Sequence, residues 1–199
     1  MHYFDNAATT FPKPDAVYDN MDSFYRTYGV NVGRGQFREA SVASHMVDET
    51  RELILELFHA SNLYSCVFTS SATEALNIIL QGFPWKQGMN VYISPFEHNA
   101  VLRTLQYIQD KYGITIREIL PDSKTLKYDM SSVKATFASQ KPDVVILTHA
   151  SNAFGNILPI ADIFSYIPVD KLFALTNPGD ITSNATLVVP AGAQETYAA

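Results

Sequence analysis

The sequence predicts an α/β domain in which helices flank a largely parallel sheet. Short apolar runs that are typical of strands alternate with longer stretches whose apolar residues recur every three or four positions, as in amphipathic helices. Strands separated by helical segments indicate βαβ units, whose strands run parallel. The run 143–148 is nearly all apolar, as in a strand covered on both faces.

The composition fits a protein with a packed core. The chain has 199 residues, of which 47% are hydrophobic, and this is enough for one sizeable domain. The net charge of −6 gives no basic surface for nucleic acid or anionic lipid. The sequence shows neither a membrane span nor a signal peptide, so we expect a cytoplasmic protein.

Up to residue 148 we expect two N-terminal helices, followed by three further helices and four strands. The two helices cover 12–26 and 36–59, and the apolar residues of the second fall on one stripe: Val42, Met46, Leu53, Leu57 and Phe58. The further helices are expected at 72–80, 98–112 and 129–139. The strands are expected at 66–69, 90–94, 114–116 and 143–148. Gly113 follows the helix 98–112 as a C-terminal capping glycine.

The C-terminal part of the chain has a different character. Three groups of turn-forming residues interrupt it, and two apolar runs remain, at 172–175 and 185–189. We therefore divide the chain into a main body, 1–163, and a divergent or truncated tail, 164–199, which completes or caps the sheet.

A candidate anion site lies in the stretch 68–77, FTSSATEALN, where an expected strand leads into a helix. The first N–H groups of a helix have no partner within it, and with the positive end of the helix dipole they attract phosphate. Hydroxyl groups of Ser70, Ser71 or Thr73 would add donors. The alternative is an ordinary serine cap, with Glu74 closing a capping box onto Ser71.

Two more polar loops follow strands. His98 stands where the strand 90–94 gives way to a helix, and its imidazole can stack on an aromatic ligand or carry a proton. Asn152 follows the strand 143–148 and offers an amide donor, although asparagine and glycine are also the residues that ordinary loops use. Because parallel strands end at one rim of the sheet, we expect Thr73, His98 and Asn152 to converge on one ligand.

The remaining candidates are weaker. The stretch 5–10, which includes Asn6 and Ala8, can line a substrate cleft or cap the next helix, and the loop with Asn31 and Arg34 can be a substrate-side loop or a solvated linker. The five histidines lack metal spacing, so we expect no metal site. The single cysteine, Cys66, is expected to be an inert core thiol rather than a nucleophile.

Four motifs together resemble the cysteine desulfurase (class V aminotransferase) family of fold-type-I, pyridoxal-phosphate-dependent enzymes. These are YFDNAATT at 3–10, FTSSATEALN at 68–77, EHNAV at 97–101, and HASN at 149–152 followed by GNILPI at 155–160. The resemblance covers about residues 2–163 and identifies this body as part of the large domain of the PLP-transferase fold.

The resemblance implies a pyridoxal 5′-phosphate site. Ala72 and Thr73 match the residues that bind the phosphate, and His98 matches the histidine that stacks on the pyridine ring and assists proton transfer. Asn152 matches the asparagine that binds the phenolic oxygen. Enzymes of the family convert L-cysteine to alanine and pass the sulfur to a catalytic cysteine as a persulfide. They are normally homodimers, and some deliver sulfur to an acceptor protein.

The chain departs from the family in its second half. No histidine precedes a lysine, so the Schiff-base lysine of the Ser/Thr-x-His-Lys pattern is missing. The family spacing from Asn152 places Asn177 where the carboxylate that binds the pyridine nitrogen is expected, and Gln194 is a displaced match to the cofactor-contacting glutamine. The C-terminal domain is missing too, so we expect a partial site and no turnover by this chain alone.

Two alternatives remain open. One is another class V activity, such as an aminotransferase or a selenocysteine lyase. The other is a non-catalytic fragment that dimerises or binds a partner through apolar surface.

Overall fold

The computed structural model describes residues 2–4, 6, 9–33, 35–58, 60 and 64–167, and the backbone of 173–177 and 187–190. The chain forms two compact units. The first consists of Met1–Asn6 and Thr10–Phe68, and the second of Ala7–Thr9 and Thr69–Ala199.

The first unit contains two helices, α1 (Asp15–Tyr28) and α2 (Arg38–Leu57), which contact each other. Both agree with the predicted segments. The predicted apolar stripe of α2 is not its buried face, because Met46, Leu53 and Leu57 are exposed and the buried residues are two alanines. No residue of α1 is buried, so α1 provides no core against which that stripe could pack.

The second unit is built on a sheet whose strands lie in the order β2-β1-β3-β4-β5. The strands are β1 (Asn90–Ile93), β2 (Thr115–Glu118), β3 (Val144–Thr148), β4 (Phe173–Asn177) and β5 (Leu187–Pro190). The first four run parallel, and β5 is antiparallel to β4. This confirms the predicted fold class.

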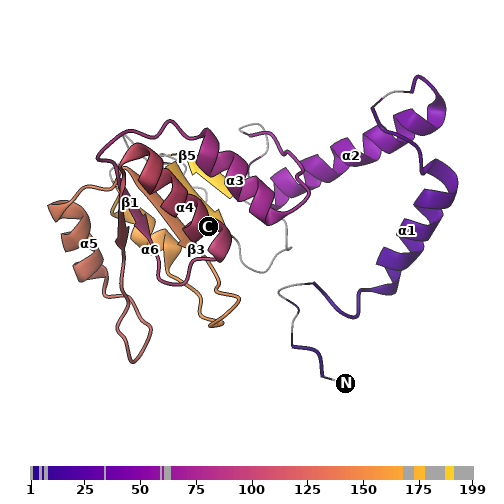
Figure 1. Cartoon of the computed structure of the whole chain (residues 1–199). Helices are drawn as coiled ribbons and strands as arrows, with labels where there is room; N and C mark the ends of the chain where they lie inside the picture. The colour runs from indigo at the N-terminus through magenta and orange to yellow at the C-terminus, as the bar shows by residue number, and fades with distance from the viewer. Residues whose placement is uncertain are drawn as a thin grey trace. The chain divides into compact units, whose positions relative to one another are not determined.

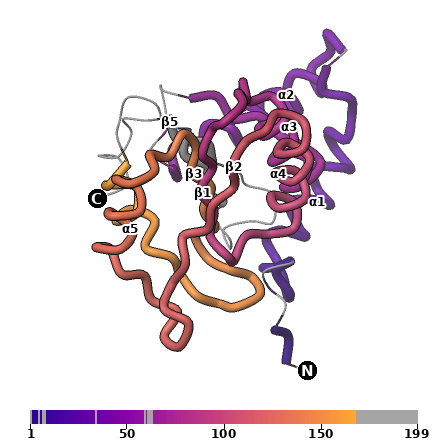
Figure 2. The backbone as a smooth tube through the Cα atoms, turned by 60° about the vertical axis from the view of Figure 1, so that its left-hand side comes forward, coloured from indigo at the N-terminus to yellow at the C-terminus, as the bar shows by residue number. Residues whose placement is uncertain are grey.

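Helices cover both faces of this sheet, as Figures 1 and 2 show. They are α3 (Ala72–Gly82), α4 (Asn99–Tyr112), α5 (Met130–Ser139) and α6 (Ile160–Ser165). Alternate residues of one strand point to opposite faces. In β3, Val144 and Ile146 pack with α3 and α4, whereas Val145 and Leu147 pack with α5 and α6. The sheet is therefore covered on both sides, as its apolar strands predict.

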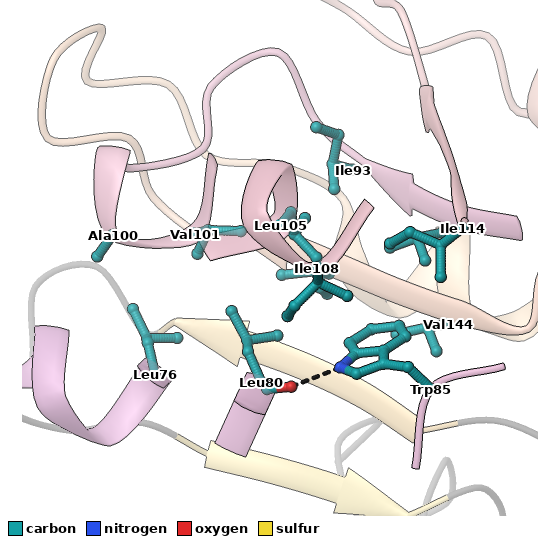
Figure 3. Close-up of a cluster of buried hydrophobic side chains, with 12 residues drawn as sticks. Leu76, Leu80, Trp85, Ile93, Ala100, Val101, Leu105, Ile108, Ile114 and Val144 are labelled. Carbon is teal, nitrogen blue, oxygen red and sulfur yellow. Dashed lines mark hydrogen bonds between the residues drawn. The ribbon is translucent and has the colours of Figure 1, made fainter. Parts of the chain in front are cut away.

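The α3–α4 side has the larger of the two apolar clusters (Figure 3). Leu105 and Ile108 of α4 are fully buried in it. Trp85, in the turn after α3, closes its end and donates its indole N–H to the Leu80 carbonyl at 2.5 Å. This cluster holds α3 against α4, and both helices carry candidate site residues at their N-termini.

Local capping chemistry sets two helix ends, of which that at Gly113 was predicted. Gly113 ends α4 in the left-handed conformation, with φ of 69°, which favours glycine. Asp129 caps α5 by accepting a hydrogen bond from the Ser131 N–H at 3.0 Å.

The predicted strand at 66–69 is wrong. These residues form no ladder, and Val67 is 79% exposed. A strand exists only where a neighbouring strand provides hydrogen-bond partners, and apolar β-branched residues alone do not supply one. Among the described residues, no helix is long and apolar enough to span a membrane.

Candidate functional site

The N-terminus of α3 is capped, and yet part of it remains open. The Ser71 hydroxyl accepts the Glu74 N–H at 3.1 Å. The Glu74 carboxylate accepts the Ser70 N–H at 2.8 Å and the Ser70 hydroxyl at 2.6 Å. The capping box therefore forms, with its return bond on Ser70 instead of Ser71. In the described part of the chain, the N–H groups of Ala72 and Thr73 donate to no protein atom, so they remain able to bind an anion.

His98 is the N-cap residue of α4. Its Nδ1 accepts the Ala100 N–H at 3.1 Å, and its backbone is extended, with φ of −68° and ψ of 150°. A nitrogen that accepts an N–H bond carries no proton, so the ring proton of the neutral imidazole is on Nε2. The side chain is exposed, with Nε2 available to a ligand.

A cavity of about 420 Å³ brings Thr73 and His98 together between α3 and α4. A polar bridge forms part of its wall, because the Thr104 hydroxyl donates to Asn77 Oδ1 at 3.0 Å. The lining residues are Thr73, Asn77, Gln81, His98, Asn99, Ala100, Arg103, Thr104 and Tyr107.

Most of these lining residues were not predicted from the sequence. Thr73, Asn77 and Gln81 lie four residues apart on α3, so they share one helix face. Asn99, Arg103 and Tyr107 are spaced in the same way on α4. Two polar stripes with a spacing of four residues are a signal in the sequence that could have identified this cavity.

Asn152 lies elsewhere on the second unit. It is exposed in a compact loop after β3, where the Gly155 N–H donates to the Ser151 carbonyl at 2.8 Å. It is not among the residues that line the α3–α4 cavity. This loop does touch the loop that precedes His98, because the rings of Phe96 and Phe154 meet edge to face with 5.2 Å between their centres.

Two of the substrate-side candidates, Asn6 and Asn31, belong to the first unit. Asn6 Oδ1 accepts the Phe11 N–H at 3.1 Å, and Asn31 Oδ1 accepts the Gly33 N–H at 2.8 Å, so both side chains stabilise local turns. Ala8 and Arg34 lie outside the described residues. Beside the Asn31 turn is a second cavity, of about 450 Å³, lined by Val32, Gly35, Gln36, Phe37, Arg38, Ala40, Ser41 and Ser44.

Cys66 is partly buried in the first unit. Burial raises the pKa of its thiol, and the nearby charge of Arg51 offsets only part of this effect. A thiol with a raised pKa is a poor nucleophile at neutral pH. The predicted position of Cys66 in the core is wrong, because the residue is only partly buried and lies in no strand.

A model of the aminotransferase class-V family matches residues 2–176, which is most of the chain. The chain belongs to the aminotransferase class-V family. Among curated relatives, a probable cysteine desulfurase of Halalkalibacterium halodurans is 32% identical over 81% of this chain and 40% of its own length. The cysteine desulfurase of Dickeya dadantii is 30% identical over 81% of this chain and 39% of its own length. This class-V chain thus spans about two fifths of the length of each of these relatives.

Solved structures share its fold. The apo cysteine desulfurase from Thermococcus onnurineus NA1 superposes with a TM-score of 0.77 at 24% identity, covering 98% of this chain and 55% of that chain. A C-DES K223A mutant, whose description names a PLP cofactor with a linked glycine, superposes with a TM-score of 0.62 at 24% identity. It covers 81% of this class-V chain and 43% of that chain.

In this class-V chain, the backbone pairing of β4 with β3 places Asn177 at the end of the sheet. Asn177 is the last residue of β4 and pairs in register with Thr148, the last residue of β3. It therefore stands at the rim where the loops to His98 and Asn152 begin. Gln194 lies outside the described residues.

Proposed function

We propose that this chain is the cofactor-binding part of a cysteine-desulfurase-like protein and that it holds pyridoxal 5′-phosphate in the α3–α4 cavity. The observation that carries the proposal is that Thr73 and His98, which come from separate motifs, line the same cavity. The open N–H groups at the start of α3 and the Thr73 hydroxyl would bind the phosphate, and the His98 imidazole would face the pyridine ring.

The residues present fit two parts of this cofactor. The free N–H groups, the hydroxyl of Thr73 and the charge of Arg103 suit a phosphate dianion, and the exposed imidazole suits an aromatic ring. None of the residues lining the cavity is a lysine or an acid. The fit therefore supports binding without a covalent link. When bound, pyridoxal phosphate supplies an electron sink for reactions at amino acids.

We further propose that this chain alone does not convert L-cysteine to alanine. No histidine in it precedes a lysine, so it lacks the pattern that holds the cofactor covalently in the family it resembles. Asn177 stands at the rim in place of an acid, and an amide cannot supply the negative charge that keeps a pyridine nitrogen protonated.

Binding is tested with pyridoxine 5′-phosphate, which lacks the aldehyde and therefore cannot react with surface lysines. Isothermal titration should show one site, and pyridoxine without phosphate should bind far more weakly. Thr73→Val and His98→Ala should each weaken binding by about tenfold, the loss expected for one contact to a charged or stacked group. The proposal is wrong if the phosphate makes no difference or if neither variant weakens binding.

Turnover is tested with pyridoxal phosphate and L-cysteine, measuring alanine and sulfide. We expect neither product. Borohydride reduction followed by mass spectrometry should find no single lysine that carries the cofactor stoichiometrically. Alanine formation above that of free cofactor would refute the proposed lack of turnover.

Exposed apolar side chains favour a second candidate, a chain that self-associates or binds a partner. On α1, Met21 is 53% exposed and Tyr25 is 70% exposed, and on α2 Leu57 is 60% exposed. Apolar surface of this kind marks interaction sites. Light scattering at micromolar concentration tests this candidate: a homodimer is expected, and a monomer across the concentration series excludes self-association.

A further inference from the structure

The side chain of Glu97 occupies a buried position between two loops. Only 8% of the residue is exposed, and each carboxylate oxygen accepts hydrogen bonds. Oε1 accepts the Ser94 hydroxyl at 2.5 Å and the Thr148 N–H at 2.7 Å. Oε2 accepts the Thr148 hydroxyl at 2.9 Å. One carboxylate thus joins the loop after β1 to the last residue of β3.

The carboxylate replaces a backbone carbonyl as the hydrogen-bond acceptor at the end of β3. The β1–β3 ladder ends at the pair Ile93–Ile146, so β1 offers no carbonyl to the Thr148 N–H. Glu97 Oε1 accepts this N–H instead. A buried backbone N–H without an acceptor costs about 1–3 kcal/mol, so Glu97 stabilises the end of β3 as well as its own loop.

The same loop is held at other points. The Phe96 N–H donates to the Ser94 hydroxyl at 3.2 Å, so Ser94 organises the turn that presents Glu97. The edge-to-face contact between Phe96 and Phe154 ties this turn to the loop of Asn152.

Burial is the main influence on the ionisation of the Glu97 carboxylate. Burial raises its pKa, and the bonds from Ser94 and Thr148 oppose that effect. In the described part of the chain, neither ion pair involves Glu97. The Tyr128 hydroxyl is buried and has no hydrogen-bond partner among the described residues, and burial and the charge of Glu97 both raise its pKa.

We propose that Glu97 is a positioning residue of the cofactor site. Its buried carboxylate binds the end of β3 and thereby fixes the loop in which His98 lies. The same strand, β3, leads to Asn152. This inference rests on the proposed cofactor binding and extends it to a residue that touches no cofactor. His98 follows Glu97 directly, so the backbone that Glu97 fixes is the one that orients the imidazole and begins α4.

The test compares substitutions along this link. Glu97→Gln replaces one acceptor oxygen with a donor that faces other donors, whereas Thr148→Val removes the hydroxyl and leaves the backbone N–H in place. Thr148→Ser restores the hydroxyl. Glu118→Gln is the matched control, because Glu118 ends the neighbouring strand β2 and is exposed. Nitrogen NMR of the His98 ring, without any cofactor, is the first measurement, and pyridoxine 5′-phosphate affinity is the second.

We expect E97Q to change the His98 ring signals, with loss of the Nδ1 acceptor pattern, and to weaken binding by about tenfold. T148V should change the ring signals less and weaken binding by about threefold. T148S should restore the wild-type ring signals and the wild-type affinity. E118Q should leave both unchanged. A merely structural role would lower the unfolding midpoint without altering the ring signals of the folded protein.

The outcomes separate the two proposals. If the wild type does not bind pyridoxine 5′-phosphate but E97Q and T148V still change the ring signals, Glu97 positions His98 and the proposed function is wrong. If the ring signals of E97Q, T148V and the wild type agree, the positioning role is refuted, whatever the cofactor does. If E97Q fails to fold, T148V and T148S decide in the same way.

Discussion

Asn77 on α3 and Thr104 on α4 are joined across the cavity wall by a hydrogen bond of 3.0 Å. The Asn77 amide also donates to the Thr73 carbonyl at 2.8 Å, so the link continues to the first turn of α3. The relative position of the two helices, on which the cavity depends, is thus set by polar groups as well as by the apolar cluster beneath them.

Thr104→Val should destabilise the second unit through loss of this bridge. Thr136→Val on α5 is the matched control, because each hydroxyl lies within hydrogen-bond distance of the carbonyl four residues earlier and only that of Thr104 also contacts another helix. We expect T104V to cost about 1 kcal/mol more than T136V in urea unfolding. Equal losses would show that the bridge contributes nothing.

The Glu74 carboxylate should make the stability of α3 depend on pH. The bonds from Ser70 lower the pKa of this carboxyl. A lowered pKa stabilises the folded state above the ordinary glutamate pKa, and the contribution is lost as pH falls through the folded value. The difference in unfolding free energy between wild type and Glu74→Gln should therefore shrink below about pH 4. Ser70→Ala should remove much of this pH dependence. If the stability difference caused by Glu74→Gln varies as steeply with pH in the Ser70→Ala protein, the Ser70 bonds are not its cause.

Leu105→Ala should be among the most damaging changes in the second unit. Leu105 is fully buried in the cluster of Figure 3, so its removal leaves a cavity and should cost about 2–5 kcal/mol. Leu102 on the same helix is 37% exposed, and Leu102→Ala should cost about 1 kcal/mol or less. Fluorescence of Trp85, the single tryptophan, which lies in the same cluster, follows unfolding.

Arg103 is the one cation among the residues that line the α3–α4 cavity, so Arg103→Gln should weaken binding of pyridoxine 5′-phosphate. A partly exposed charge contributes modestly, and we expect a loss of about threefold to tenfold that diminishes with added salt. Lys124→Gln removes the same charge from a loop away from the cavity and should have no effect. Equal effects of the two variants would indicate nonspecific attraction.

The elements that the sequence predicts well are those set by local chemistry. Gly113 was predicted to end its helix because a left-handed C-terminal turn favours glycine, and the structure has that turn. The segment 66–69 was predicted wrongly because strand formation depends on a distant partner that no local pattern reveals.

The same distinction applies to the candidate site. The motifs of Thr73 and His98 stand out in the sequence, and their helices share a cavity. The facing stripes that complete this cavity require knowing that α3 packs on α4, which depends on buried residues such as Leu76 and Leu105. Convergence of Asn152 on the same cavity was expected from the shared rim of the sheet, but side-chain direction within a loop is not set by the strand before it.

The hydrogen bond between His98 and Ala100 makes one side chain both the start of a helix and a candidate proton carrier. In the neutral ring only Nδ1 can take up a proton, and a proton there would abolish the acceptor that holds the first turn of α4, so while this hydrogen bond persists the ring can donate a hydrogen bond through Nε2 but cannot accept a proton. Fraying of α4 at its N-terminus would therefore report directly on the ionisation of the imidazole.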